Sequence, residues 1–137
     1  MVNITEITDL LIKHEDLRTL PYTDTTGHLT IGVGRNLTDD GISIDEAMIM
    51  LDDDINNKIS DLKKHLPYYD SLPDKVQLVL IDMCFNMGIG GLLTFKNTLL
   101  LIKTGQYKKA ADAMLKSLWA KQVGNRAIED SNILKSI

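Results

Sequence analysis

The segment between Ser43 and Pro67 limits the possible folds of this chain more than any other stretch. Ser43 and Glu46 have the spacing of a helix-capping box, and Pro67 ends the segment. Between them, apolar residues recur every three or four positions, at Met48, Leu51, Ile55, Ile59, Leu62 and Leu66. The pattern predicts one continuous amphipathic helix of roughly 22 residues, about 33 Å long. A helix of that length in a chain of 137 residues indicates two lobes joined by the helix.

The remaining segments predict a small α+β lobe before this helix and an all-α lobe after it, an α+β fold that is mostly α. Asn3 and Glu6 form another capping box, so we expect a helix over residues 3–14. LPYTD and HLTIGVG, separated by a Thr-Thr-Gly turn, alternate as the strands of a hairpin do. After Pro67 we expect four helices, over residues 74–88, 95–103, 107–121 and 126–137. Gly88, Gly90 and Gly91 would end the first of them. Thr94 would cap the second and Asn125 the fourth.

Composition and charge narrow the classes of function. The single cysteine, Cys84, cannot form an intrachain disulfide, and its apolar neighbours indicate a buried structural thiol. Residues 1–66 hold 13 acids and 6 Lys or Arg, whereas residues 67–137 hold 6 acids and 9 Lys or Arg. The balance argues against nucleic-acid binding, which needs a dense basic face. It leaves room for a mildly basic C-terminal half that faces an anionic polymer.

We expect no secretion signal, no membrane span, no metal and no cofactor. MVNITEITDLLIKHED lacks a basic n-region and a continuous apolar h-region, and no apolar run approaches the length of a span. NLTDDGISIDEA, aligned with an EF-hand loop, has Ala47 where a glutamate is needed, and Glu46 misses that position by one. His14, His28 and His65 do not have zinc-site spacing.

The stretch HEDLRTLPYTDTTGHLTIGVG gathers candidate catalytic residues. Glu15 is expected at or just past the end of the first helix, where the negative end of the helix dipole favours its protonated form. Asp24 lies in the hairpin, where turn amides and water would keep it ionised, and the Thr30 hydroxyl could hold a water. Cleavage of a glycosidic bond requires one protonated and one ionised carboxyl across a groove. On spacing alone, Glu15 could equally face solvent and Asp24 could merely close an Asx turn.

The same stretch resembles the active-site segment of the T-even phage lysozymes, glycoside hydrolase family 24. That family has a Glu, an Asp nine residues later, and a Thr six residues further on within a T-x-G-x-G strand; Glu15, Asp24 and Thr30 have this spacing. YYDSLPDKVQLVLIDMCFNMG, GLLTFKNTLLLIKTGQYKKAADAM and WAKQVGNRA are also similar to the family's C-lobe helices. The resemblance implies a lysozyme-like two-lobed fold in a single domain over residues 1–137, with an N-lobe over about 13–45, a connecting helix over about 44–66, and a C-lobe over about 67–137 that includes the helix 3–13.

The resemblance also implies a reaction, cleavage of the β-1,4 bond between N-acetylmuramic acid and N-acetylglucosamine by single-displacement inversion. Glu15 would be the general acid, Asp24 the base that activates water, and Thr30 the residue that positions the water. The supporting or substrate-binding residues would be Gly32, Asn86, Phe95, Asn97, Thr98 and Arg126, the last by approaching the catalytic Glu. A role of Asn97 and Thr98 as caps or helix-surface residues stays open. A lytic transglycosylase, or a wall-binding relative without activity, also stays open.

The resemblance implies that the chain binds peptidoglycan and neither binds nucleic acid nor inserts stably into a membrane. It also implies a monomer that is made in the host cytoplasm and released with the help of a holin-type partner. Three departures from the family pattern stand out. Asp16 replaces a common Gly, and the segment 37–43 is short, which predicts a reduced N-lobe side of the cleft. Arg35 replaces a common His, and we predict that it pairs with Asp54 on the long helix.

Overall fold

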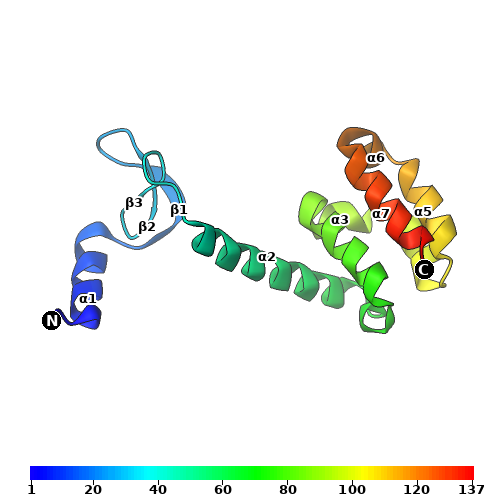
Figure 1. Cartoon of the computed structure of the whole chain (residues 1–137), viewed down its shortest axis with the longest axis horizontal. Helices are drawn as coiled ribbons and strands as arrows, with labels where there is room; N and C mark the ends of the chain where they lie inside the picture. Colours follow the sequence, from blue (N-terminus) through cyan, green and yellow to red (C-terminus); the bar gives the residue numbers. More distant parts are fainter. The chain divides into compact units, whose positions relative to one another are not determined.

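Helices make up most of the structure, and the strands are confined to one small sheet (Figure 1). The computed structural model describes all residues, Met1–Ile137. The elements are α1 (Ile4–Glu15), β1 (Arg18–Thr23), β2 (Leu29–Gly32), β3 (Arg35–Asn36), α2 (Ile44–His65), a 3-10 turn (Tyr69–Ser71), α3 (Asp74–Leu93), α4 (Lys96–Lys103), α5 (Tyr107–Leu115), α6 (Leu118–Val123) and α7 (Asn125–Lys135). The prediction of a mostly-α α+β class is confirmed.

The chain divides into two compact units, an N-terminal unit Met1–Ile49 and a C-terminal unit Met50–Ile137, and the boundary falls within α2. Each unit is described by itself below. The organisation as a single domain with the predicted lobe boundaries stays a prediction.

Helix α1 begins and ends where the sequence indicates. The Asn3 side chain accepts a hydrogen bond from the Glu6 N–H at 3.1 Å, which caps the first turn. Asp16 follows the helix with a φ of 69°, in the left-handed region, and its N–H donates to the Ile12 carbonyl at 2.9 Å. Glu15 is therefore the last helical residue, as predicted.

The sheet is a three-stranded antiparallel meander with β2 in the middle. The predicted hairpin is confirmed, with Thr23 opposite Leu29 and Tyr22 opposite Thr30, whereas the short third strand, β3, was not predicted. Thr30 also pairs with Asn36 on β3. Its place in the central strand makes Thr30 the one buried residue of the N-terminal unit, only 3% exposed.

Helix α2 has the predicted start and the predicted length of 22 residues. The capping box is reciprocal, because the Glu46 N–H donates to Ser43 Oγ at 3.1 Å and the Ser43 N–H donates to Glu46 Oε1 at 2.9 Å. These two bonds satisfy backbone donors that the first turn of a helix leaves without partners.

The predicted partner of Arg35 is wrong. Arg35 pairs with an acid of the long helix, but the acid is Glu46 rather than Asp54: its two terminal nitrogens donate to the two Glu46 carboxylate oxygens at 2.9 and 2.8 Å. Arg35 also donates to the Gly41 carbonyl at 3.2 Å. The short connection between β3 and α2 brings the strand onto the first turn of the helix, whereas Asp54 lies two turns further along.

Glu46 is expected to titrate far below an ordinary glutamate. The Arg35 hydrogen bonds, followed by the Ser43 N–H, lower the pKa of Glu46 from 4.5 to about 2. Because the folded pKa lies below the unfolded one, the stabilisation from this pair is present above pH 4.5 and is lost as the pH falls through about 2. The Glu46 carboxyl carbon shift in NMR should have its midpoint near that pH, and Arg35→Gln should raise the midpoint. A wild-type midpoint near 4.5 would contradict the bidentate pair.

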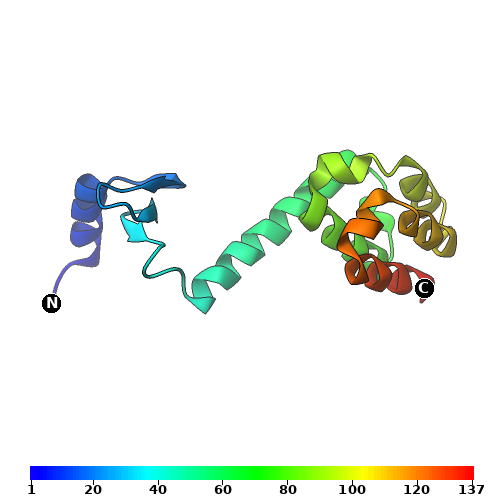
Figure 2. The same ribbon diagram turned by 90° about the horizontal axis from the view of Figure 1, so that it is seen from above.

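The C-terminal unit holds the hydrophobic core, and α3 runs through it. The buried α3 residues are Val76, Val79, Leu80, Met83, Cys84 and Leu92. By length and composition alone α3 is apolar enough to cross a membrane, and those buried side chains give it the place of a core helix instead. Helices α5 and α7 pack side by side, as Figure 1 and Figure 2 show, and α3 contacts α7. Cys84 is buried as predicted, and burial raises the pKa of its thiol.

Several predicted helix ends in this unit are wrong. Gly88 interrupts α3 with a φ of 76°, but the helix resumes and runs to Leu93. The segment 107–121 is two helices, because Ser117 caps α6 by accepting from the Ala120 N–H at 3.1 Å. Thr94 closes the end of α3, where its hydroxyl donates to the Gly91 carbonyl at 2.6 Å, and does not cap α4. Asn125 is the first residue of α7, after Gly124 at the cap position.

Candidate active site

The Glu15 carboxyl lies over the turn between β2 and β3. A methyl group placed on Gly34 would stand 2.7 Å from Glu15 Oε2, closer than atoms can pack, and 3.1 Å from its Cδ. Gly34 also has a φ of +67°, in the region that favours glycine. The second glycine of the T-x-G-x-G strand therefore makes room for the Glu15 carboxyl. Glu15 remains exposed to solvent on its other side.

We expect Gly34→Ala to lower activity by roughly tenfold or more, because a misplaced catalytic group is costly even at small displacements. The new methyl group would push the carboxyl of Glu15 away from its place. Gly41→Ala is the matched control, since Gly41 has a similar φ of +59° and nothing within 4 Å of the position that a methyl group would take. Both variants should lose similar stability in urea denaturation, but only Gly34→Ala should lose the rate of wall lysis. Equal activity in the two would contradict the contact.

Asp24 is held by a turn that follows β1. Its Oδ1 accepts hydrogen bonds from the Thr26 N–H, the Thr26 hydroxyl and the His28 N–H, each at 2.9 Å. These donors, with the His28 N–H first, lower the pKa of Asp24, so the carboxylate is ionised at neutral pH. Asp24 thus does close an Asx turn. Because all three bonds go to Oδ1, the other oxygen is left to accept a proton.

The Thr30 hydroxyl donates its hydrogen bond to the His28 carbonyl at 3.0 Å. His28 therefore connects the two side chains, since its N–H binds Asp24 and its carbonyl binds Thr30. With its proton used in this way, the Thr30 oxygen can only accept a hydrogen bond from a water.

Asp24 and Thr30 belong to the hairpin of the N-terminal unit, and Glu15, the last residue of α1, approaches Gly34 in the turn after β2. Asp24 follows Thr23, which pairs with Leu29, the first residue of β2. The Glu15 carboxyl lies against Gly34, beyond the last residue of β2. Strand β2 covers three residue steps, about 10 Å. The two carboxyl groups therefore belong to opposite ends of a short strand, with Thr30 within it. Gly32, predicted to meet substrate, has no atom within 4 Å of the position that a side chain would occupy, so its backbone is open to approach.

Sequence reasoning missed the residues that support Asp24. The His28 ring contacts the Thr26 hydroxyl through Nδ1 at 2.6 Å and Asp39 through Nε2 at 3.3 Å. Asn36 fixes Asp39 by donating to its carboxylate at 2.9 Å. The spacing D-x-T-x-H, with a threonine two residues after an aspartate, is typical of an Asx turn and could have indicated this network.

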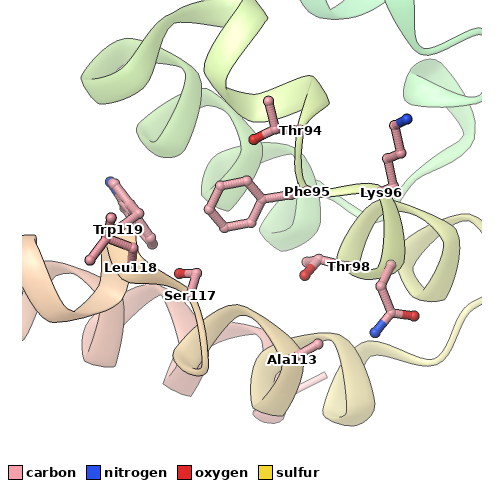
Figure 3. A pocket seen from close by; sticks show the side chains of 9 residues that line it. Thr94, Phe95, Lys96, Thr98, Ala113, Ser117, Leu118 and Trp119 are labelled. Atoms are coloured by element: carbon pink, nitrogen blue, oxygen red, sulfur yellow. The ribbon is translucent and has the colours of Figure 1, made fainter.

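In the C-terminal unit, Phe95 and Thr98, two of the residues predicted to bind substrate, line a groove together with Trp119 (Figure 3). This groove of about 410 Å³, here called the Trp119 groove, is lined by Thr94, Phe95, Lys96, Asn97, Thr98, Ala113, Ser117, Leu118 and Trp119. The Phe95 ring meets the Trp119 ring edge-to-face, with centroids 6.0 Å apart. Asn86 accepts from Trp119 Nε1 at 2.7 Å. Thr98 is only 4% exposed, so it is not a helix-surface residue. Aromatic rings with a few polar groups are typical of ligand sites.

Arg126 is bound within the C-terminal unit. Its Nε and one terminal nitrogen donate to the two Asp82 carboxylate oxygens at 3.0 and 2.8 Å, and the same terminal nitrogen donates to the Asp82 carbonyl at 3.1 Å. The carboxylate that holds Arg126 near the start of α7 is therefore Asp82 of α3, which sequence reasoning missed. An approach of Arg126 to Glu15 stays a prediction.

Comparisons with known proteins match most of the chain. The model of the phage lysozyme family matches residues 12–134. The chain is 29% identical over 147 residues to the pre-baseplate central spike protein Gp5 of Enterobacteria phage T4, a match that covers 87% of this chain and 26% of that protein. It is 27% identical over 157 residues to the probable T4-type lysozyme 1 of Dictyostelium discoideum, with 90% of each covered. The chain thus spans about a quarter of the length of the first relative and most of the second.

Proposed function

The chain belongs to the phage lysozyme family of glycoside hydrolases, and we propose that it hydrolyses the β-1,4 bond between N-acetylmuramic acid and N-acetylglucosamine in peptidoglycan. The observation that carries the proposal is the hairpin of the N-terminal unit. It fixes an ionised carboxylate at Asp24 and makes room for a second carboxyl, Glu15, against Gly34. Binding alone would not need both groups.

Glu15 is the general acid in this proposal. Its carboxyl donates a proton to the glycosidic oxygen as the bond from the anomeric carbon breaks. Asp16, with its left-handed backbone, ends α1 directly after Glu15. The Glu15 carboxyl packs against Gly34. The acid is therefore positioned by the end of a helix and by a turn rather than by a flexible loop.

Asp24 and Thr30 prepare the attacking water. The free Oδ2 of Asp24 takes one proton from the water, and the Thr30 oxygen accepts the hydrogen bond of the other O–H. With both hydrogens engaged, a lone pair of the water oxygen is left to attack the anomeric carbon. The attack comes from the face opposite the leaving oxygen, which inverts the configuration.

The separation of the two carboxyl groups distinguishes inversion from retention. Inverting enzymes place their carboxyls roughly 6.5–9.5 Å apart to leave room for water, whereas retaining enzymes place them about 5 Å apart. Three residue steps of extended strand, about 10 Å, separate the two ends of β2 near which Asp24 and Glu15 lie. The two carboxyl groups thus lie near different ends of the strand, and we propose that a water, rather than Asp24 itself, attacks the sugar.

The other predicted site residues have supporting roles. We assign Phe95, Asn97, Thr98 and, through its bond to Trp119, Asn86 to sugar binding in the Trp119 groove. The family likeness further leads us to propose a monomer that is made in the host cytoplasm and reaches the wall with a holin-type partner.

Product analysis tests the proposal. Purified peptidoglycan digested in ¹⁸O-labelled water should yield reducing ends that carry one heavy oxygen, and the first products seen by NMR should be the inverted anomer. A lytic transglycosylase would give 1,6-anhydro ends without solvent oxygen, and a wall-binding relative would give no products. Asp24→Asn should lower hydrolysis about a hundredfold, the scale of a lost general base. Anhydro products, or full activity in that variant, would overturn the mechanism.

A further inference from the structure

The ring of His28 lies between two side chains of the N-terminal unit, and each of its nitrogens has one neighbour. Nδ1 is 2.6 Å from the Thr26 hydroxyl oxygen, and Nε2 is 3.3 Å from Asp39 Oδ2. The side chain is 35% exposed, so it can exchange protons with solvent. Histidine is the side chain that ordinarily changes its charge between pH 5 and 8. The hydrogen bonds of this ring therefore depend on which of its nitrogens carry a proton.

The Thr26 hydroxyl fixes the protons of the ring as long as it binds Asp24. Its oxygen lies 2.9 Å from Asp24 Oδ1 and 2.6 Å from His28 Nδ1, but the hydroxyl has only one hydrogen. An ionised carboxylate can only accept, so the hydrogen of Thr26 points to Asp24 and Nδ1 must donate to Thr26. The Asp39 carboxylate also accepts, which requires a hydrogen on Nε2. All these contacts are satisfied together only by a ring with a hydrogen on both nitrogens, the charged imidazolium.

A neutral ring has one hydrogen and must change one of its two contacts. If Nε2 lost its hydrogen, a lone pair would face the Asp39 carboxylate, which Asn36 holds in place by donating to it at 2.9 Å. If Nδ1 loses its hydrogen, that nitrogen accepts the Thr26 hydroxyl instead, and both ring nitrogens keep a partner. The second change is therefore favoured. The proton leaves Nδ1 for solvent, and the Thr26 O–H turns from Asp24 Oδ1 to the ring.

Asp24 and Asp39 are the charged side chains that face the ring. Asp24 Oδ1 is 3.6 Å from Nδ1, too far for a direct hydrogen bond, so the Thr26 hydroxyl connects the two. The other charged groups of the sheet have partners of their own. Arg18 of β1 pairs with Asp16 at 3.6 Å, and Arg35 of β3 pairs with Glu46 at 2.8 Å.

We propose that His28 is a positioning residue for the catalytic base and controls, through the Thr26 hydroxyl, how many hydrogen bonds Asp24 receives. The inference rests on the proposed function, because it takes Asp24 as the base. With the ring charged, Asp24 Oδ1 accepts three hydrogen bonds; with the ring neutral, it keeps the two from backbone N–H groups.

The loss of the third bond makes Asp24 a stronger base. The His28 N–H lowers the pKa of Asp24 most, and the Thr26 hydroxyl and the charge of His28 lower it further. Deprotonation of the ring removes the last two of these causes and leaves the first. A base with a higher affinity for protons takes a proton from water more readily, so Asp24 gains strength as the ring loses its charge.

Nitrogen-15 NMR of the full chain tests the protons of the ring directly. We expect hydrogens on both ring nitrogens near pH 5 and a hydrogen on Nε2 alone near pH 9. The Asp24 carboxyl carbon should show a shift step at the pH at which His28 titrates. Thr26→Val should shrink this step, and Thr26→Ser, which restores a hydroxyl, should recover it. A neutral ring with its hydrogen on Nδ1, or an undiminished step in Thr26→Val, would overturn the proposal.

Rates of hydrolysis separate this effect from a merely structural role of Thr26. The kcat of Thr26→Val on soluble glycan chains of peptidoglycan is divided by the wild-type kcat at each pH, so that the titration of Glu15 cancels. The variant never has the hydroxyl bond, and the wild type loses it when the ring is neutral. The ratio should therefore be roughly two to five near pH 5 and approach one near pH 8, without a change in KM. A ratio that is the same at every pH would mean a structural role and contradict the proposal.

Two further variants locate the source of the pH dependence. Thr25→Val is the matched control, because Thr25 is an exposed threonine of the same turn, and its rate should equal that of the wild type at every pH. In a chain that carries His28→Gln, adding Thr26→Val should change kcat by the same factor at every pH. A pH-dependent factor in that chain would overturn the role of His28. An absence of hydrolysis by the wild type would reject the proposed function, whereas the ring protons seen by NMR test the turn of the hydroxyl independently of activity.

Discussion

Glu15→Gln is expected to abolish wall lysis, lowering the rate of bond cleavage by roughly 10²–10⁴-fold, the contribution typical of a general acid. The amide has nearly the shape of the carboxyl, so it still fits over Gly34, but it has no acidic proton to give to the leaving oxygen. Glu15 is exposed and forms no ion pair in its unit, so the fold should not depend on its charge. The variant should therefore keep the circular dichroism spectrum and unfolding midpoint of the wild type.

The measurement is the loss of turbidity of outer-membrane-permeabilised cells, with reducing ends counted in parallel. Glu6→Gln is the matched control, because it makes the same chemical change in the first turn of the same helix, away from Gly34. That variant should lyse cells at the wild-type rate. Lysis by Glu15→Gln at the wild-type rate would remove Glu15 from the mechanism.

Features that depend on neighbours in sequence were the ones that sequence alone could predict. The capping boxes of α1 and α2 need only residues three apart, and the hairpin needs only alternation around a turn. The end of α1 at Glu15 follows from the same local signals. Local hydrogen bonds of this kind form wherever the backbone permits them, so their pattern is written in the spacing of residues.

Competition between short-range signals explains the helix ends that were predicted wrongly. Ser117 lies within a helical pattern, yet its hydroxyl caps a new helix, because a serine can satisfy the backbone in either way. Thr94 was taken for the start of α4, but it follows α3 so closely that its hydroxyl binds the preceding turn. Sequence spacing cannot decide between two such uses of one hydroxyl group.

Contacts between residues that are far apart in the sequence were the hardest to predict from it. Arg35 could be expected to pair with α2, but the choice of Glu46 over Asp54 depends on how the short connection closes. In the same way, the glycines of the T-x-G-x-G strand suggest close approach of a substrate, but only the structure shows that Gly34 makes room for Glu15. The pairing of Arg126 with Asp82 joins residues 44 positions apart and has no local signal.

Asp130 is the most unusual of these distant contacts. It lies on α7, is only 4% exposed, and its Oδ2 is buried without a hydrogen-bond partner. Burial, followed by a hydrogen bond with Asp82 and the charge of that carboxylate, raises the pKa of Asp130 to about 8. The Arg126 and Glu129 charges act more weakly and in opposite directions. At neutral pH Asp130 is therefore a neutral acid, and its proton is available to the Asp82 carboxylate of α3.

The stability of the chain should consequently fall as the pH rises from about 4 to about 8. Asp130 has a pKa of 3.8 when unfolded and about 8 when folded, so the folded state binds more protons between these values. Asp130→Asn keeps an N–H donor toward Asp82 but does not titrate. In urea denaturation it should match the wild type near pH 4 and exceed it at pH 9 by several kcal/mol, since the shift from 3.8 to about 8 covers about four pKa units and one unit corresponds to about 1.4 kcal/mol. Asp53→Asn, at an exposed position of α2 without an ion pair, is the control and should follow the wild-type curve. Parallel curves for Asp130→Asn and wild type would mean that Asp130 is ionised in the folded chain and that the proton between α3 and α7 does not exist.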